Sequence, residues 1–307
     1  MKNRFYILLS GMALSLSTLS ADVDSGDYGS EQMASADDKG TPFKVDLRGD
    51  WIRPVRTKNS PLKGRLLHYY EVQADASGVF YHSPCHKEAL GIQVSFNSTQ
   101  LYWNHNPYYD QKNFNNFGIV LGGVTNRLCG WTWQGSVSAN MDTKHINFGD
   151  YTTYDLLMWG RYDWRKNIGV HVGFLAWTGL KIDKILPILG FDWSFCDKWR
   201  INAIFPINAS IVYQYSENCS IAAAGRFFWN RHRIEDSAPV SRGIWEYRNA
   251  GVELAVNYSH CNWFSANAHA GYSLGGDVKL SNSRHKSTKK FEFGGSPYVG
   301  GEVALKF

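Results

Sequence analysis

The chain has 307 residues, a formal net charge of +5 and a mean hydropathy of −0.34. A charge this small does not indicate a nucleic-acid partner, and beyond the N-terminus no apolar stretch is long enough for a membrane-spanning helix. The length would allow two soluble domains, but no linker divides the strand-rich region. We therefore expect one folded domain.

The N-terminus has the pattern of a secretory signal peptide over residues 1–21. Lys2 and Arg4 precede an apolar run at 5–14, and the small residues that follow fit cleavage after Ser20 or Ala21. The run is too short for a membrane anchor, and a buried helix in a protein that is not exported is the alternative. The mature chain is therefore predicted to leave the cytoplasm.

Residues 22–42 are rich in Asp and Glu among Ser, Gly and Ala, and they show no hydrophobic periodicity. Low hydrophobicity combined with charge of one sign predicts disorder. We expect a disordered acidic N-terminal tail here, followed by the folded domain at 43–307.

From residue 43 onward, apolar and polar residues alternate with period two, which is the pattern of a strand with two different faces. In 250–258, for example, Val252 and Leu254 flank Glu253. Strands are predicted at 43–53, 65–80, 89–104, 114–124, 130–142, 151–164, 168–178, 185–195, 199–205, 208–215, 219–230, 245–258, 262–275 and 296–307. A soluble β-sandwich would also alternate, so alternation alone does not decide the architecture.

The connections between these strands favour a membrane barrel. Every second connection is short, whereas most of the others are long and polar, and this asymmetry between two rims is typical of membrane barrels. The expected fold class is all-β, a transmembrane antiparallel β-barrel of about 14 strands. If the chain at Phe205 and Pro206 forms a bulge rather than a turn, about 12 strands is the alternative.

The last strand carries a signal of its own. Val299, Val303, Leu305 and the terminal Phe307 share one face of this strand. A chain that ends in this way resembles the C-terminal assembly signal of Gram-negative outer-membrane β-barrel proteins. The resemblance implies that the barrel assembly machinery reads this strand, and that outer-membrane lipids and lipopolysaccharide surround the barrel.

The five cysteines fall at or beside the short turns: Cys85, Cys129, Cys196, Cys219 and Cys261. An oxidising periplasm permits disulfides, but five unpaired residues in turns are an equal alternative. Neighbouring turns lie roughly 10 Å apart and a disulfide needs Cα atoms within about 7 Å, so bridges between molecules are favoured over internal ones. Cys196–Cys219 is the first internal pair to consider. The turn cysteines resemble those of chlamydial-type outer-membrane proteins, which implies disulfide-linked envelope proteins as partners.

Several charged or titratable residues are predicted to face the lumen: Glu71, Asp75, Asp155, Arg161, His171, Arg200, Arg226, Glu253 and His269. Mutual pairing that stiffens the interior is favoured over catalysis. No catalytic or nucleotide-binding motif is present, and His82, Cys85 and His86 are too few ligands for a zinc site. We therefore expect no enzyme activity, no cofactor and no metal.

Residues 187–193, Trp199 and residues 204–206 resemble an uncharacterised family of predicted outer-membrane barrels. About fourteen strands enclose more room than side chains fill, which predicts a passive channel or small-solute transporter. The alternative is a structural or adhesive surface protein of the cell envelope with a closed lumen. The basic loops at 53–65 and 276–290 are interpreted as solvated, and attraction of lipopolysaccharide phosphates is their alternative role.

Overall fold

The structure is a computed structural model that describes residues 43–58, 62–83, 88–128, 130–144, 148–180, 183–235, 238–260, 263–282 and 288–307. The strands are β1 (Phe43–Arg56), β2 (Leu66–Ser83), β3 (Glu88–Trp103), β4 (Asn113–Thr125), β5 (Trp131–Asp142), β6 (Thr152–Arg165), β7 (Ile168–Gly179), β8 (Lys184–Cys196), β9 (Trp199–Phe205), β10 (Asn208–Ser216), β11 (Cys219–Arg233), β12 (Ile244–His260), β13 (Phe264–Ser281), β14 (Thr288–Phe293) and β15 (Ser296–Lys306). The described ranges contain no helix that is long and apolar enough to cross a membrane. The predicted signal peptide at 1–21 and tail at 22–42 lie outside them and stay predictions.

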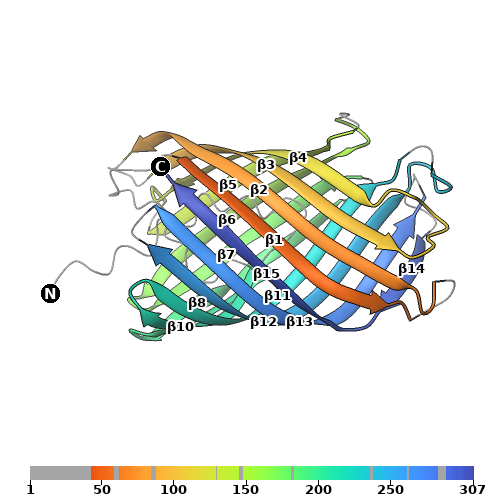
Figure 1. Ribbon diagram of the computed structural model, residues 1–307. Coiled ribbons are helices and arrows are strands. Elements are labelled where there is room, and N and C mark those ends of the chain that lie inside the picture. The colour runs from red at the N-terminus through yellow and green to blue at the C-terminus, as the bar shows by residue number, and fades with distance from the viewer. Residues whose placement is uncertain are drawn as a thin grey trace.

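The strands form a single antiparallel sheet that closes on itself (Figure 1). From β1 to β13 each strand pairs with its neighbours in sequence, except that β13 pairs onward with both β14 and β15. β15 also pairs with β1, and Thr57 just after β1 bridges to Phe293 at the end of β14. β14 and β15 therefore share one position in a ring of fourteen, which confirms the predicted barrel of about 14 strands.

Most strands turn an apolar face outward and a mostly polar face into the barrel. In β3, Ile92 and Phe96 are each 41% exposed, whereas Gln93 and Ser95 are 3% and 5% exposed. Exposed apolar side chains recur in this way all along the outer surface. So large an apolar surface is unfavourable in water and matches the hydrocarbon of a bilayer.

The two ends of the barrel differ in their connections. At one end, which we call the turn rim, the connections include the residue pairs 166–167, 197–198 and 217–218. At the opposite end, the loop rim, they include the longer segments 57–65, 104–112 and 234–243. The start of β1 and the end of β15 both lie at the turn rim (Figure 1).

The predicted boundaries are wrong in one loop. Residues 276–281 and 288–293 belong to strands β13 and β14, where the sequence predicted a loop from 276 to 295. The cause is a bulge, because the register between β12 and β13 shifts beside Ala250 and Gly275 has φ +94°. A bulge reverses which residues of a strand face inward, so the period-two pattern breaks although the strand continues. Residues 206–207, by contrast, join β9 to β10 as a turn, so the twelve-strand alternative is not formed.

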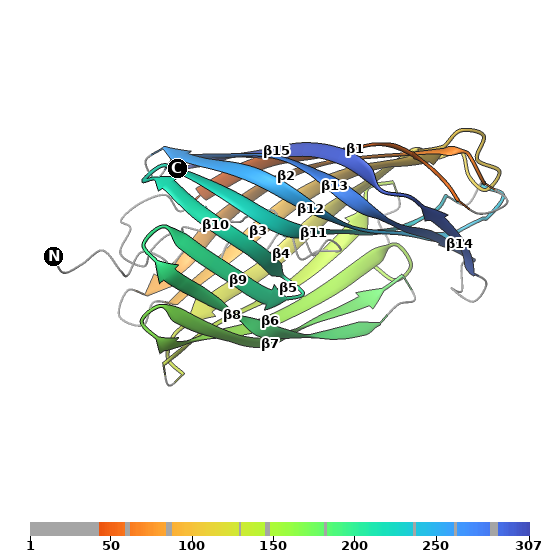
Figure 2. The ribbon, with the colours of Figure 1, turned by 90° about the horizontal axis from the view of Figure 1, so that it is seen from below.

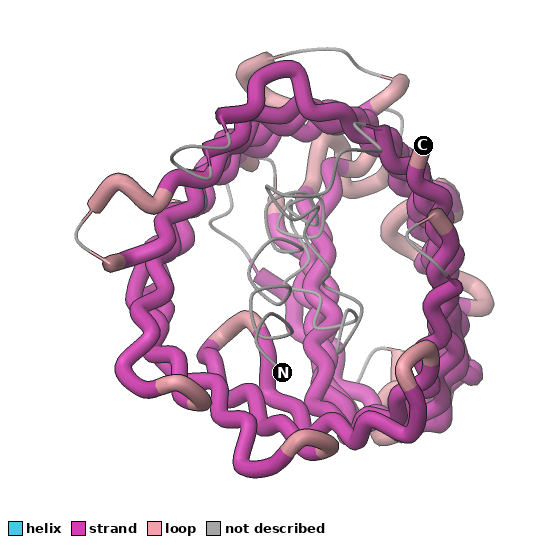
Figure 3. Tube along the Cα trace, turned by 90° about the vertical axis from the view of Figure 1, so that its left-hand side faces the viewer, coloured by secondary structure: helices cyan, strands magenta, loops and turns pink. Residues whose placement is uncertain are grey.

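The loop-rim ends of β11 and β12 lie inside the barrel rather than in its wall. β10 pairs with β11 only as far as Gly225, because β9 and β10 are much shorter than β11 and β12 (Figure 2). From Phe228 onward β11 has no exposed residue on either face, and Asn230 and Arg231 are each 2% exposed. Figure 3, a view from the turn rim, shows strand running through the middle of the ring. We call residues 228–233 and 244–249 the inner hairpin.

Side-chain charge explains why this hairpin leaves the wall. Phe227 is 47% exposed, and Trp229 and Arg231 follow it in the same row of β11; likewise Leu254, 65% exposed, shares a row of β12 with Glu246. A guanidinium and a carboxylate in these rows would face lipid if the hairpin stayed in the wall, and charge in hydrocarbon is costly. Folding the hairpin inward removes both groups from the lipid.

Candidate functional site

The candidate site is the lumen, which has two unlike halves. Toward the turn rim its wall carries mainly small or polar side chains, including Gln93, Ser95, Gln134, Ser136, Ser210, Ser220, Ala222 and Asn257. Toward the loop rim the inner hairpin occupies the lumen and contacts the wall on both of its faces. The lumen therefore has a mainly polar lining toward the turn rim and is crossed by side chains of the inner hairpin toward the loop rim.

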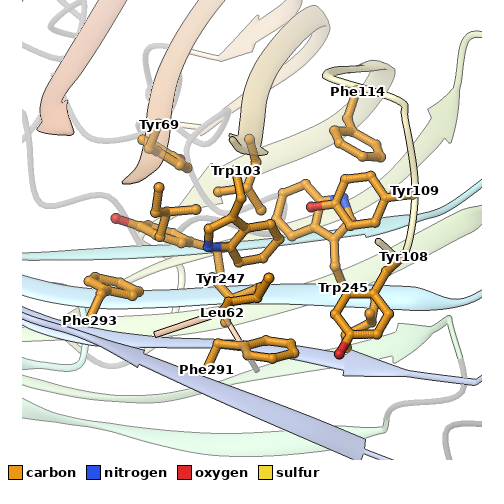
Figure 4. Packing of buried hydrophobic residues seen from close by; sticks show 14 of the residues in the cluster. Leu62, Tyr69, Trp103, Tyr108, Tyr109, Phe114, Trp245, Tyr247, Phe291 and Phe293 are labelled. Atoms are coloured by element: carbon orange, nitrogen blue, oxygen red, sulfur yellow. The ribbon is translucent and has the colours of Figure 1, made fainter. Parts of the chain in front are cut away.

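An aromatic cluster lies between one face of the inner hairpin and the wall (Figure 4). Tyr69 of β2 stacks on Tyr247 with ring centroids 4.3 Å apart, and Phe114 of β4 meets Trp245 edge-on at 4.9 Å. In the ring, β4 and β12 are separated by β3, β2, β1, β15 and β13. These contacts therefore cross the lumen and narrow it. Further members of the cluster are Trp103, Tyr108, Tyr109, Phe291 and Phe293.

Hydrogen bonds fix the same face of the hairpin to the wall. The Asn230 amide donates to the hydroxyl of Thr99 at 2.7 Å and to the carboxylate of Glu71 at 3.2 Å. Tyr69 and Asn97 also donate to Glu71. Glu71, which the sequence placed in the lumen, thus anchors the inner hairpin.

A buried ion network lies at the base of the hairpin. Arg226, fully buried, donates to Asp50 at 2.7 Å and to Glu253 at 3.2 Å. His269 Nε2 lies 2.8 Å from the other carboxylate oxygen of Asp50, and the Tyr298 hydroxyl donates to Glu253 at 2.8 Å. The network connects β1, β11, β12, β13 and β15 across the seam where the barrel closes. Three of the predicted lumen residues, Arg226, Glu253 and His269, meet here and interact with one another through this network.

A second network lies on the opposite wall. Arg161 makes a bidentate contact with Asp192, at 2.9 and 3.0 Å. The indole of Trp159 donates to His171 Nδ1 at 2.9 Å, and His171 Nε2 lies 2.7 Å from Asp192. Because Nδ1 accepts, Nε2 carries the proton and donates to Asp192. This arrangement stiffens β6, β7 and β8.

The remaining predicted lumen residues have simpler surroundings. Asp75 accepts from Gln73 at 2.8 Å, and Asp155 accepts from Ser138 at 2.9 Å. Arg200 is half-buried on the inner face of β9. The described ranges contain no group of three or more His, Cys, Asp or Glu side chains that could hold a metal ion.

The structure describes two of the five cysteines. Cys196 and Cys219 are free thiols at the turn rim, and Cys196 is exposed. Cys85, Cys129 and Cys261 lie outside the described residues. Crosslinking between molecules therefore stays a prediction.

The C-terminal residues that the sequence placed on one face of the last strand lie on the outer surface of the barrel. Val299, Val303 and Phe307 are 49%, 46% and 62% exposed on the outer surface, and Leu305 is partly exposed in the same row. Their reading by assembly machinery stays a prediction.

Sequence reasoning missed the inner hairpin and two acidic partners, Asp50 and Asp192. The hairpin did leave a signal: at its loop-rim end the lipid-facing row of β11 carries Arg231 and Arg233, and that of β12 carries Glu246 and Arg248. The acidic partners left none, because which charges meet across a barrel depends on its register and closure rather than on local spacing.

Together the closed antiparallel ring, the apolar outer surface and the polar interior define a β-barrel of the outer-membrane type. No protein family model matches the chain. It is 29% identical over 226 residues to an uncharacterised protein of Chlamydia muridarum, with 71% of each chain covered. It is 26% identical to an uncharacterised protein of Chlamydia trachomatis serovar D, again with 71% of each chain covered. These relatives confirm the predicted chlamydial resemblance and do not test crosslinking.

Solved structures that resemble the chain include two channels. An outer-membrane channel from Pseudomonas putida F1 matches with a TM-score of 0.48 and 8% identity, covering 87% of this chain and 96% of that one. The monoaromatic hydrocarbon channel TodX, as a deletion mutant, matches with a TM-score of 0.41 and 10% identity, covering 97% of this chain and 99% of that one. Similarity at this level concerns the fold alone.

Proposed function

We propose that the protein is a non-enzymatic channel of the bacterial outer membrane that passes small solutes. The observation that carries this proposal is the lumen toward the turn rim, where a ring of fourteen strands is lined by side chains such as Ser95, Ser136 and Ala222. A barrel of eight strands is filled by its own side chains, whereas one of fourteen leaves room for solute. Small and polar groups along that room suit a hydrated path.

The inner hairpin sets the character of the proposed channel. Its aromatic side chains, such as Trp245 and Tyr247, reach across to β2 and β4 and narrow the path toward the loop rim. We therefore propose a selective channel of low conductance rather than a wide general pore.

Conductance in planar lipid bilayers tests this proposal. The wild-type protein is expected to give small discrete steps, and Trp245→Ala combined with Tyr247→Ala is expected to enlarge them because two rings leave the constriction. Trp164→Ala is the matched control, since that indole is 60% exposed on β6 and lies outside the lumen. A folded barrel that conducts in neither the wild type nor the double variant would sink the channel proposal.

A structural or adhesive surface protein with a closed lumen is the second candidate. It is favoured by the same cross-lumen contacts and by the Arg226 network, which together brace the interior. Such a role predicts a folded barrel without conductance.

The proposed partners follow from the proposed outer-membrane location. We propose that outer-membrane lipids and lipopolysaccharide surround the barrel, and that the assembly machinery recognises the terminal strand through residues such as Phe307. Disulfide-linked envelope proteins are proposed partners at the turn rim.

A further inference from the structure

The second face of the inner hairpin carries a cationic site that the channel proposal does not use. This face holds Trp229 and Arg231 of β11 and Glu246 and Arg248 of β12. It looks toward the inner side of β7 and β8, because Trp177 contacts Trp229 and Lys184 approaches Glu246. Aromatic rings and positive charges therefore meet on this side of the lumen.

Arg231 is the central group of the site. It is 2% exposed, yet none of its three guanidinium nitrogens has a hydrogen-bond partner in the described part of the chain. Its guanidinium lies 5.3 Å from the centre of the Trp229 ring. A buried guanidinium without hydrogen bonds is costly, so a partner that completes its bonds would be favoured.

The carboxylates near Arg231 do not hydrogen-bond its guanidinium. Glu246 accepts from Trp229 at 2.7 Å, contacts Arg248 and lies 3.8 Å from Lys184. Asp155, which also interacts electrostatically with Arg231, is bound by Ser138 and lies beyond direct hydrogen-bond contact with the guanidinium. Arg231, Arg248 and Lys184 thus face three carboxylates, those of Glu246, Asp155 and Asp183, but none of these hydrogen-bonds the Arg231 guanidinium.

A second unpartnered donor lies against the same Trp229 ring as Arg231. The indole nitrogen of Trp177 is buried and has no hydrogen-bond partner among the described residues, and its ring meets Trp229 edge-on at 4.6 Å. An apolar cluster continues from these rings, and its members include Leu157, Trp159, Leu175, Ile188 and Ile204. Hydrogen-bond donors that could bind an anion therefore lie beside an apolar surface.

We propose that this face binds the carboxylate of a small organic anion that has an apolar or aromatic body. The Arg231 guanidinium takes the carboxylate in a bidentate fork, the Trp177 N–H adds a hydrogen bond, and the body lies against Trp229 and the apolar cluster. The inference rests on the proposed channel, of which it names the substrate class.

Binding to the refolded full-length barrel tests the inference. Tryptophan fluorescence and calorimetry are followed during titration with benzoate, with benzyl alcohol (the same ring without the charge), and with acetate and inorganic phosphate (charge without the ring). Saturable binding of benzoate is expected, with affinity at least about tenfold above the other three probes, because only benzoate satisfies both the guanidinium and the apolar surface.

Arg231→Gln is expected to weaken benzoate binding by about tenfold or more, as loss of a charge-assisted pair requires. Arg165→Gln is the matched control, because Arg165 lies 5.0 Å from the Trp164 ring in the same kind of stack but is exposed at the turn rim. Its benzoate affinity should equal that of the wild type. Trp177→Phe, which removes only the N–H donor, should weaken binding by several-fold and serves if Arg231→Gln does not fold.

Three results would overturn the inference: no benzoate binding to folded wild-type barrel, equal affinity for all anions, or unchanged affinity in the folded Arg231 or Trp177 variants. Absence of binding would mean that Arg231 is balanced internally, with Asp155 as its counter-ion. The channel proposal fails separately, by absence of conductance. Benzoate binding without conductance would therefore support this site and remove the channel, and conductance without benzoate binding would do the reverse.

Discussion

At the scale of single residues, the interior of this barrel is governed by a few fully buried charges. Arg226 has no solvent exposure and bridges Asp50 of β1 to Glu253 of β12. A buried ion pair contributes little net stability over an apolar substitute, but removal of one partner leaves the others uncompensated. The network therefore acts mainly by specifying which strands meet where the barrel closes.

We predict that Arg226→Met destabilises the folded barrel by about 3–5 kcal/mol, because Glu253 would stay buried without its cation and Asp50 would keep only one guanidinium, that of Arg48. Arg127→Met is the control, since Arg127 pairs with Glu88 at the turn rim with 57% of its side chain exposed. An exposed pair is worth about 0–1 kcal/mol. Urea unfolding of the refolded proteins in lipid measures both, and equal losses in the two variants would contradict the assignment.

At the scale of elements, the bulge in β13 decides how the barrel reaches the loop rim. Gly275 has φ +94°, and a Cβ placed there would lie 2.7 Å from the carbonyl oxygen of Phe293. Glycine tolerates this backbone conformation, whereas other residues strain it. The bulge lets β13 turn inward with the inner hairpin while keeping its pairing with β12 and β14.

Gly275→Ala is accordingly expected to cost about 1–3 kcal/mol of folding stability through backbone strain. Gly225→Ala is the matched control, because its φ lies outside the left-handed region and a Cβ there would meet no atom closer than 3.9 Å. Unfolding midpoints at constant urea slope would report both changes. Tolerance of Gly275→Ala equal to that of Gly225→Ala would show that the bulge is not strained.

At the scale of the whole molecule, one rim combines both chain ends of the barrel with the described thiols. Cys196 and Cys219 lie at the turn rim as free thiols, and Cys196 is open to solvent. An exposed thiol in an oxidising compartment is available to a second protein. The barrel wall itself is held by closed strand pairing, so its stability does not depend on these residues.

We therefore expect non-reducing gels of intact envelopes to show high-mass species of this protein that collapse on reduction. Cys→Ser at all five positions should abolish them, while the barrel still fractionates with the outer membrane and migrates in a heat-modifiable way. Migration as a monomer on non-reducing gels, with all five thiols free to react with an alkylating reagent, would contradict the crosslinking prediction. Recovery of the wild-type protein in the soluble periplasmic fraction would contradict the proposed outer-membrane location.

The barrel architecture could largely be predicted from the sequence, because successive residues of a barrel strand face lipid and lumen in turn and differ in polarity accordingly. Val252, Leu254 and Glu253 show which face meets lipid and which meets the lumen, without knowledge of any partner strand. The alternation of short and long connections predicted about fourteen strands, and the structure decided against twelve because residues 206–207 form a turn. The local pattern of polarity was sufficient to predict the strands wherever each residue faces either lipid or the lumen.

Tertiary structure decided what happens inside the barrel. Asp50 meets Arg226 only because β1 and β11 face each other after closure, and Arg231 is buried only because β9 and β10 end early and the inner hairpin folds inward. Such contacts join residues far apart in sequence, and their spacing obeys no local period. The alternating pattern thus predicts the wall, whereas the side chains that narrow the lumen and the cationic site beside them follow from how the closed sheet folds onto its own interior.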